Sequence, residues 1–111
     1  VIYFPKGVGS QCVSIASTVK ADCVAFDHFV DPIDIKTNLE RTNIAVQGGL
    51  DPMIMKVGGR TLEKHVEHYM HCFQHSRFIF NLGHGIHPGV DPEHAGALFK
   101  AVVELSPAYH Q

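Results

Sequence analysis

Four short apolar runs, rich in β-branched and aromatic residues, are spaced along the chain and predict β-strands. They cover residues 1–4, 23–27, 44–47 and 78–82. Each run is continuously apolar and does not alternate with polar residues, which is typical of strands that are buried on both faces of a parallel sheet. We therefore expect a parallel sheet whose two faces are both covered.

Helical patterns lie between these predicted strands, at residues 10–19, 61–75 and 92–105. In each amphipathic pattern the apolar positions recur with the spacing that places them on one stripe of a helix. The clearest pattern is 61–75, whose stripe consists of Leu62, Val66, Tyr69, Met70 and Phe73. The last pattern has a stripe made of Leu98, Val102 and Leu105.

An Asp-Pro pair follows a predicted strand or its exit loop at three places. An aspartate caps the free N–H groups of a first helical turn, and proline suits the first helical position because its missing N–H is not needed there. The pairs predict helix starts at Asp31-Pro32, Asp51-Pro52 and Asp91-Pro92. The recurrence of strand, loop, Asp-Pro and helix predicts one continuous series of βα units with no linker.

About four βα units fit into the 111 residues. A complete (β/α)8 barrel needs roughly 250 residues, and nothing in the predicted strands suggests the blunted edges of a complete open sheet. The chain also starts at Val1, already inside an apolar run. We therefore expect an α/β fold in which residues 1–111 form the second half of a (β/α)8 TIM barrel, as a piece of a longer protein.

Composition excludes several classes of function. The formal net charge is -2 with histidines neutral, and charged residues make up 18%, so nothing attracts nucleic acid or an acidic membrane over long range. No apolar run approaches the roughly 18 residues of a membrane span, and no signal peptide is visible. The three cysteines are scattered without a CxxC pair, which indicates reduced and mostly buried thiols.

One histidine stands where barrels of this kind carry their chemistry, at the C-terminal end of a strand. His84 follows the predicted strand 78–82 and lies between Gly83 and Gly85. Glycines allow a ligand to approach the backbone closely, and an imidazole can donate to a carboxylate, bind a metal or move a proton near neutral pH. A histidine packed at the rim against a neighbouring loop is the alternative, and position alone does not decide between them.

Other histidines raise the possibility of a metal site. The residues at spacings of three and four along the predicted helix 61–75 are His65, His68, His71 and His75. There is no HExxH motif, and this helix would lie on the outer ring of a barrel, so we favour a solvated polar face. His84 and His87 form an HxxH pair without an evident third ligand. We expect no metal at either place.

Two further features of the predicted strand ends have a structural and a functional interpretation. Asp27 ends the second strand, and we favour an aspartate that anchors the following loop by accepting backbone N–H bonds over a catalytic carboxylate. The glycines at Gly48-Gly49 and Gly83-x-Gly85 could cradle a phosphate. Neither fits GxGxxG, and we do not expect a phosphate site.

The stretch NLGHGIHPGVDPEHAGALFKAVVE, residues 81–104, closely resembles the C-terminal signature of the uroporphyrinogen decarboxylase family. Three more stretches resemble elements of that family in the right order: VIYFPKGVGS its F-x-K-G strand, ADCVAFDHFV its G-x-D-W-T-V stretch, and NIAVQGGLDPMIM its L-Q-G-N-L-D-P element. The resemblance thus covers nearly the whole chain. Two positions depart from the family pattern: His28 replaces the usual tryptophan, and Gly49 replaces the usual asparagine.

The resemblance implies a TIM barrel that acts as a cytoplasmic homodimer without metal or organic cofactor. Members are carboxy-lyases that remove carbon dioxide from the four acetate groups of uroporphyrinogen III, giving coproporphyrinogen III in haem and porphyrin biosynthesis. The family's L-G-H-G histidine lines the substrate cleft, and this role carries over to His84. We favour a donor to a substrate carboxylate over a general acid.

The resemblance also implies that this segment alone is inactive. The family's arginine-containing loop, its pyrrole-binding aspartate, its tyrosine and its serine do not occur in this chain. The three arginines, Arg41, Arg60 and Arg77, precede predicted strands or separate helical segments, so we do not expect them in a pocket for eight carboxylates. Lys6 alone follows a strand end.

Two alternatives to the decarboxylase remain open. The corrinoid-dependent methyltransferases resemble it in fold but bind zinc through His and Cys at strand ends, and this chain offers no cysteine at a predicted strand exit. A truncated, non-catalytic remnant would differ only in residues upstream of Val1.

Overall fold

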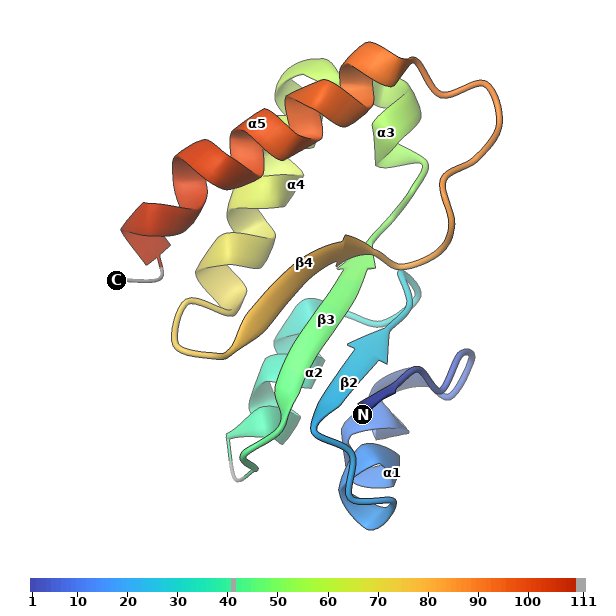
Figure 1. Ribbon diagram of the computed structural model, residues 1–111, viewed down its shortest axis with the longest axis vertical. Coiled ribbons are helices and arrows are strands. Elements are labelled where there is room, and N and C mark those ends of the chain that lie inside the picture. Colours follow the sequence, from blue (N-terminus) through green and yellow to red (C-terminus); the bar gives the residue numbers. More distant parts are fainter. Residues whose placement is uncertain (41, 110–111) are drawn as a thin grey trace.

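The computed structural model describes residues 1–40 and 42–109. Its sheet contains four strands: β1 (Ile2–Tyr3), β2 (Cys23–Phe26), β3 (Ala45–Leu50) and β4 (Phe78–Leu82). All neighbouring pairs are parallel, and the strands lie in chain order, β1-β2-β3-β4 (Figure 1). The expected α/β fold with a parallel sheet is therefore confirmed, and this arrangement is consistent with part of a barrel.

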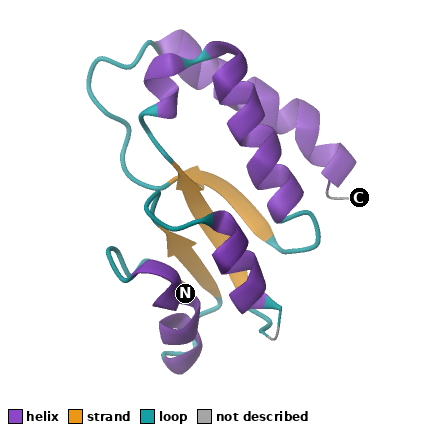
Figure 2. Ribbon diagram, turned by 180° about the vertical axis from the view of Figure 1, so that it is seen from behind, coloured by secondary structure: helices purple, strands orange, loops and turns teal. Residues whose placement is uncertain are grey.

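The helices occupy one side of this sheet. They are the short 3-10 helix η1 (Gly9–Gln11), then α1 (Cys12–Thr18), α2 (Pro32–Leu39), α3 (Ile54–Val57), α4 (Gly59–Cys72) and α5 (Pro92–Tyr109). Helices α1, α2 and α4 lie behind the strands in Figure 1 and in front of them in Figure 2, while α5 packs on α4. Connections of one hand between strands in sequential order place their helices on the same face. A barrel winds in this way, whereas a doubly wound sheet carries helices on both faces.

After three of the strands, an aspartate side chain caps the backbone N–H groups of the turn that follows, as the Asp-Pro pairs predict. Asp31 Oδ1 accepts a hydrogen bond from the Ile33 N–H at 2.9 Å, and Asp91 Oδ1 accepts one from the Glu93 N–H at 2.9 Å. Helices α2 and α5 begin at the prolines that follow. Asp51 accepts from the Met53 N–H at 2.9 Å in the same way, but α3 begins only at Ile54 and lasts one turn.

Several element bounds differ from those that the sequence predicts. Strand β3 continues through Gly48 and Gly49 to Leu50, instead of ending at residue 47. A Cβ at Gly49 would lie 2.5 Å from ring atoms of Phe26, so these glycines are strand residues over which a neighbouring ring packs. Helix α4 begins at Gly59 and ends at Cys72, earlier at both ends than 61–75, and α5 continues past residue 105 to Tyr109.

The hydrophobic core lies between the sheet and its helices. The strand side chains that point to the helices, Val24, Phe26, Val46 and Leu50, are fully buried. The predicted stripe of α4 meets them, since Leu62, Val66, Tyr69, Met70 and Phe73 are all buried. The Tyr69 hydroxyl donates to the Gly49 carbonyl oxygen at 2.9 Å, and burial raises the pKa of this tyrosine well above its usual value.

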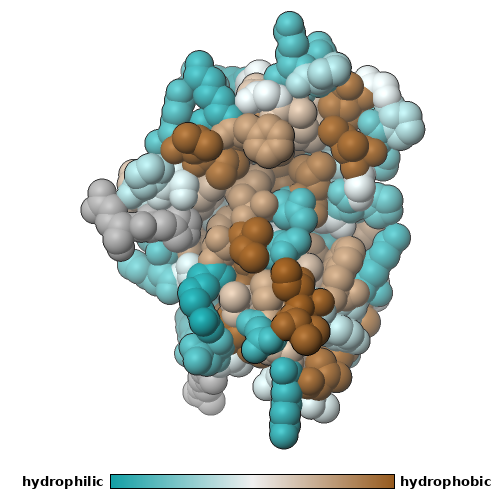
Figure 3. Space-filling model, viewed as in Figure 1, coloured by the Kyte–Doolittle hydropathy of each residue, from teal (hydrophilic) through white to brown (hydrophobic). Residues whose placement is uncertain are grey.

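The other face of the sheet is uncovered within the described residues. The register places Ile2, Cys23 and Ala45 in one row and Ala25, Gln47 and Ile79 in another. Ile2 is 55% exposed and Ile79 47% exposed, and apolar surface gathers over the strands in Figure 3. Within the described residues, β2 is buried throughout, whereas β1 and β4 leave side chains exposed because no helix lies over this face.

No described helix is both long enough and apolar enough to cross a membrane.

The bare face and the two free sheet edges generate a prediction about residues 1–111 expressed alone. We expect aggregation or partial unfolding, because exposed apolar side chains and unpaired strand edges associate in water. Size-exclusion chromatography with light scattering, followed by a thermal melt monitored by circular dichroism, measures both. A monodisperse monomer with a sharp cooperative transition would show that this part of the chain needs no further covering.

Candidate functional site

The four strands end at one edge of the sheet, and the loops that leave them form the candidate site. These exit loops are residues 4–8, 27–31, 51–53 and 83–91. The carboxyl ends of parallel strands meet at the same edge, where α/β proteins bind their ligands. The predicted residue His84 lies in the last of these loops.

Asp27 joins the first two exit loops. Its side chain is only 4% exposed. Oδ2 accepts a hydrogen bond from the Gly7 N–H at 2.9 Å, and Oδ1 accepts one from the Phe29 N–H at 3.0 Å. The prediction that Asp27 anchors the following loop is confirmed, and the same carboxylate also holds the loop after β1.

Gly83 joins the last exit loop to the second. Its N–H donates to the Leu50 carbonyl oxygen at 2.7 Å. A Cβ at Gly83 would lie 2.3 Å from the His28 backbone nitrogen and 2.8 Å from the Asp27 carbonyl carbon. The glycine therefore lets two pieces of backbone approach each other, whereas Gly85 has nothing within 4 Å of its Cβ position.

His84 and His87 extend from this loop beyond the close contact. His84 is exposed, and its Nδ1 lies 3.3 Å from the Gly85 carbonyl oxygen. The two imidazole rings are nearly parallel, with an interplanar angle of 12° and centroids 6.0 Å apart. The structure thus places the predicted residues Gly83, His84 and Gly85 together at the strand exits, with His87 beside them.

The acidic side chains on these loops are occupied by the backbone. Asp27 binds two N–H groups, and Asp31, Asp51 and Asp91 each accept one in a helix cap. The four exit loops contain a single lysine or arginine residue, Lys6, and its side chain is exposed. Besides the aspartates, the side chains of these loops that can donate a hydrogen bond to a ligand are Lys6 and the histidines His28, His84 and His87.

The arginines lie elsewhere in the described chain. Arg77 directly precedes β4, at the amino-terminal ends of the strands and opposite the exit loops. Its guanidinium donates to the Asn43 carbonyl oxygen. Arg60 lies in the first turn of α4. The prediction that neither lines the site is confirmed by these positions, while Arg41 lies outside the described residues.

The cysteines and the remaining histidines are also away from the exit loops. Cys12 and Cys72 lie in helices and Cys23 begins β2. All three are buried free thiols, and burial raises their pKa values. The histidines predicted to lie on a solvated face are all exposed: His65, His68 and His71 on α4, and His75 in the turn after it. Within residues 1–40 and 42–109, no three His, Cys, Asp or Glu side chains are placed to hold a metal ion.

One feature of the second exit loop escapes sequence analysis. His28 Nδ1 is buried and has no hydrogen-bond partner among the described residues, and its ring lies 4.2 Å from that of Phe29. Only the contact with Gly83 reveals this packing, and that contact joins residues far apart in the sequence.

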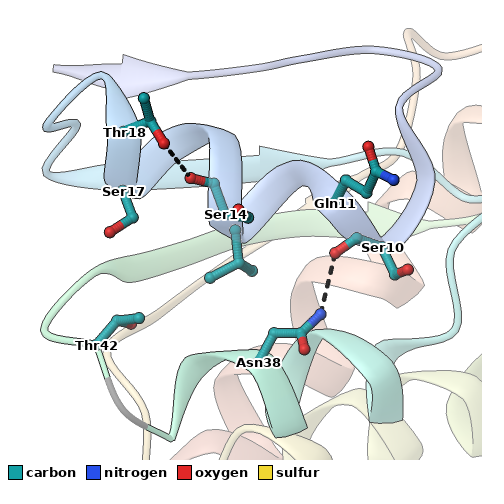
Figure 4. A pocket seen from close by; sticks show the side chains of 8 residues that line it. Ser10, Gln11, Ser14, Ser17, Thr18, Asn38 and Thr42 are labelled. Carbon is teal, nitrogen blue, oxygen red and sulfur yellow. Dashed lines mark hydrogen bonds between the residues drawn. The ribbon is translucent and has the colours of Figure 1, made fainter.

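A polar hollow of about 540 Å³ lies between α1 and α2, away from the exit loops (Figure 4). Hydroxyl and amide side chains line it, but several of them already bind backbone. Thr18 donates to the Ser14 carbonyl oxygen at 3.0 Å, and Asn38 donates to the Ser10 carbonyl oxygen at 3.0 Å. Without a charged side chain in its lining, this hollow lacks the groups that would fix an ionic substrate.

Comparison with known proteins assigns the family. Residues 1–105 match the family described as Uroporphyrinogen decarboxylase (URO-D). The chain belongs to the uroporphyrinogen decarboxylase family. A protein named uroporphyrinogen decarboxylase from Hydrogenovibrio crunogenus is 40% identical over the whole chain, which spans 31% of that relative. Relatives of the same name from Jannaschia sp. and Cereibacter sphaeroides are 40% and 37% identical over 92% of the chain, covering 29% and 30% of their own lengths. The chain thus spans less than a third of these curated relatives.

The two glycines beside His84 give a matched pair of substitutions in a full-length family member that carries this segment. Gly83→Ala should lower the free energy of unfolding by about 2 kcal/mol, because the new methyl group meets backbone that has little room to shift. Gly85→Ala should change it by less than about 0.5 kcal/mol, since its Cβ position is open.

Urea denaturation of the two variants and the wild type measures the difference. Equal stabilities for Gly83→Ala and Gly85→Ala would mean that the β4 loop does not pack against the β2 exit as described.

Proposed function

We propose that this chain is the C-terminal portion of a TIM-barrel uroporphyrinogen decarboxylase. The full-length enzyme removes carbon dioxide from the four acetate groups of uroporphyrinogen III and gives coproporphyrinogen III, on the path to haem and other porphyrins. It works as a cytoplasmic homodimer and uses neither a metal nor an organic cofactor. Membership in the family supports this activity.

The bare sheet face and the free edge of β4 support completion of the barrel by the rest of the protein. An apolar hollow of about 470 Å³ runs beside that edge, between β4 and α5. Exposed side chains on its rim include Ile86, Phe99 and Val103, at 53%, 70% and 71%. Further βα units laid against β4 would cover both this hollow and the bare face.

The position of His84 is the observation that carries the assignment of the site. Its imidazole is exposed at the strand exits, on a loop that Gly83 fixes to the neighbouring strand, and no described carboxylate neutralises it. With both nitrogens protonated, the ring donates to the Gly85 carbonyl oxygen through Nδ1 and to a substrate carboxylate through Nε2. We assign His84 this donor role.

The chemistry of the reaction explains why a donor is useful here. A protonated pyrrole carbon creates a cation, which accepts the electron pair when the acetate group loses carbon dioxide. The methylene that remains then takes up a proton. Holding a substrate with eight carboxylates in the orientation that aligns this electron flow requires several positive or N–H donors.

No observation favours the corrinoid-dependent methyltransferase. The cysteines that would bind its zinc are absent from the exit loops, where the described chain carries none. A truncated remnant is distinguished from an enzyme by the coding sequence upstream of Val1, which should continue in frame and encode the arginine loop, aspartate, tyrosine and serine of the family.

His84→Ala in the full-length enzyme should lower kcat/KM for uroporphyrinogen by about 10- to 100-fold, the range for a lost hydrogen bond to a charged group. The exposed side chain contributes little to the core, so the melting temperature should change by no more than a few degrees. His75→Ala, in the exposed turn that follows α4, serves as the control and should retain full turnover. Wild-type turnover in His84→Ala would leave this histidine without a role in the cleft.

A further inference from the structure

We propose that His87 is a second substrate-binding residue, which donates to a carboxylate of the tetrapyrrole beside the one that His84 binds. This inference rests on the proposed function and extends it to a residue for which the sequence pattern gave no role.

The first observation is the geometry of the pair. The rings of His84 and His87 are within 12° of parallel and their centroids are 6.0 Å apart. An imidazole donates in the plane of its ring, so two nearly parallel rings can present their donors side by side to neighbouring carboxylates. A substrate with carboxylates around its rim presents such groups in adjacent positions.

The second observation is that the nitrogens of His87 are free and accessible. No hydrogen bond joins its imidazole to any described residue. The His87 side chain is half-buried. Its nitrogens, however, are not among the fully buried side-chain atoms that lack a partner in the described chain, where His28 Nδ1 is the one such atom. The His87 ring is thus partly held by its surroundings, while its nitrogens reach the surface.

The third observation is that the loop between β4 and α5 is tied at both ends. Gly83 N–H donates to Leu50 at its start, and at its end His94 Nδ1 lies 2.5 Å from the Met55 carbonyl oxygen. A Cβ at Gly58 would lie 2.7 Å from the same His94 ring, so this histidine is packed against the α3–α4 junction. Pro88, directly after His87, further restricts the backbone. Donors on such a loop need little ordering when a ligand binds.

The fourth observation concerns charge. The carboxylate nearest in sequence, Asp91, accepts the Glu93 N–H in the cap of α5, and its backbone carbonyl accepts from the His94 N–H. No salt bridge joins a described aspartate or glutamate to either histidine of the pair. No carboxylate of the described chain therefore competes with a ligand for these two imidazoles.

The test uses three variants of the full-length enzyme with uroporphyrinogen as substrate. His87→Phe keeps an aromatic ring but removes both nitrogens, and it should raise KM about 5- to 20-fold while kcat changes less than 2-fold. His87→Asn restores an N–H donor and should recover most of this loss. His65→Phe, on the exposed face of α4, is the matched control and should leave KM unchanged.

The outcomes separate this inference from the function on which it rests. A wild-type enzyme that does not decarboxylate uroporphyrinogen would refute the proposed function itself. An active wild type with an unchanged KM in His87→Phe would overturn the role of His87 alone. So would a His87→Asn variant as impaired as His87→Phe, because the loss would then come from packing and not from a lost donor.

Discussion

The parallel pairing of four strands in chain order constrains everything else in this molecule. Each strand must be followed by a connection that returns to the start of the next, and sequential order keeps all of these connections on one face. The helices therefore share a single core with one side of the sheet, in which Phe26, Val46 and Leu50 are sealed by the apolar stripe of α4. The same constraint leaves the second face bare and gathers all four exit loops at one edge.

The exit loops divide their polar groups between structure and ligand. Asp27, Asp31, Asp51 and Asp91 all satisfy backbone N–H groups that would otherwise be unpaired, and such caps stabilise loops and helix starts by about 1 kcal/mol each. Besides these aspartates, the exit loops carry Lys6 and three histidines, and the imidazoles of His84 and His87 lie on the β4 loop.

The sequence predicted the elements that depend on local signals. Apolar positions at helical spacing predicted the stripe of α4, the Asp-Pro pairs predicted the starts of α2 and α5, and the flanking glycines singled out His84. Features that depend on contacts between distant residues were not predicted. Within β3, Gly48 lies against the Phe26 backbone and Gly49 against the Phe26 ring, and the break between α3 and α4 accompanies His94 packed on Gly58.

The burial of the strands shows the same limit. A continuous apolar run indicates that both faces of a strand are covered in the complete fold, but it does not say which part of the chain covers each face. Ile79 is 47% exposed because the side of β4 opposite the helices has no partner among the described residues. The apolar pattern therefore carries information about a protein larger than the described sheet.

In the proposed full-length barrel, the bare face of this sheet is the inner wall. Thiol labelling of single-cysteine substitutions at Ile79, on the bare face, and at His65, on the exposed face of α4, examines this arrangement, since the three cysteines of residues 1–111 are buried. Ile79→Cys in the folded full-length protein should react with a maleimide at least about 100-fold more slowly than His65→Cys, because burial controls access to a thiol. Comparable rates at the two positions would show that nothing covers this face of the sheet.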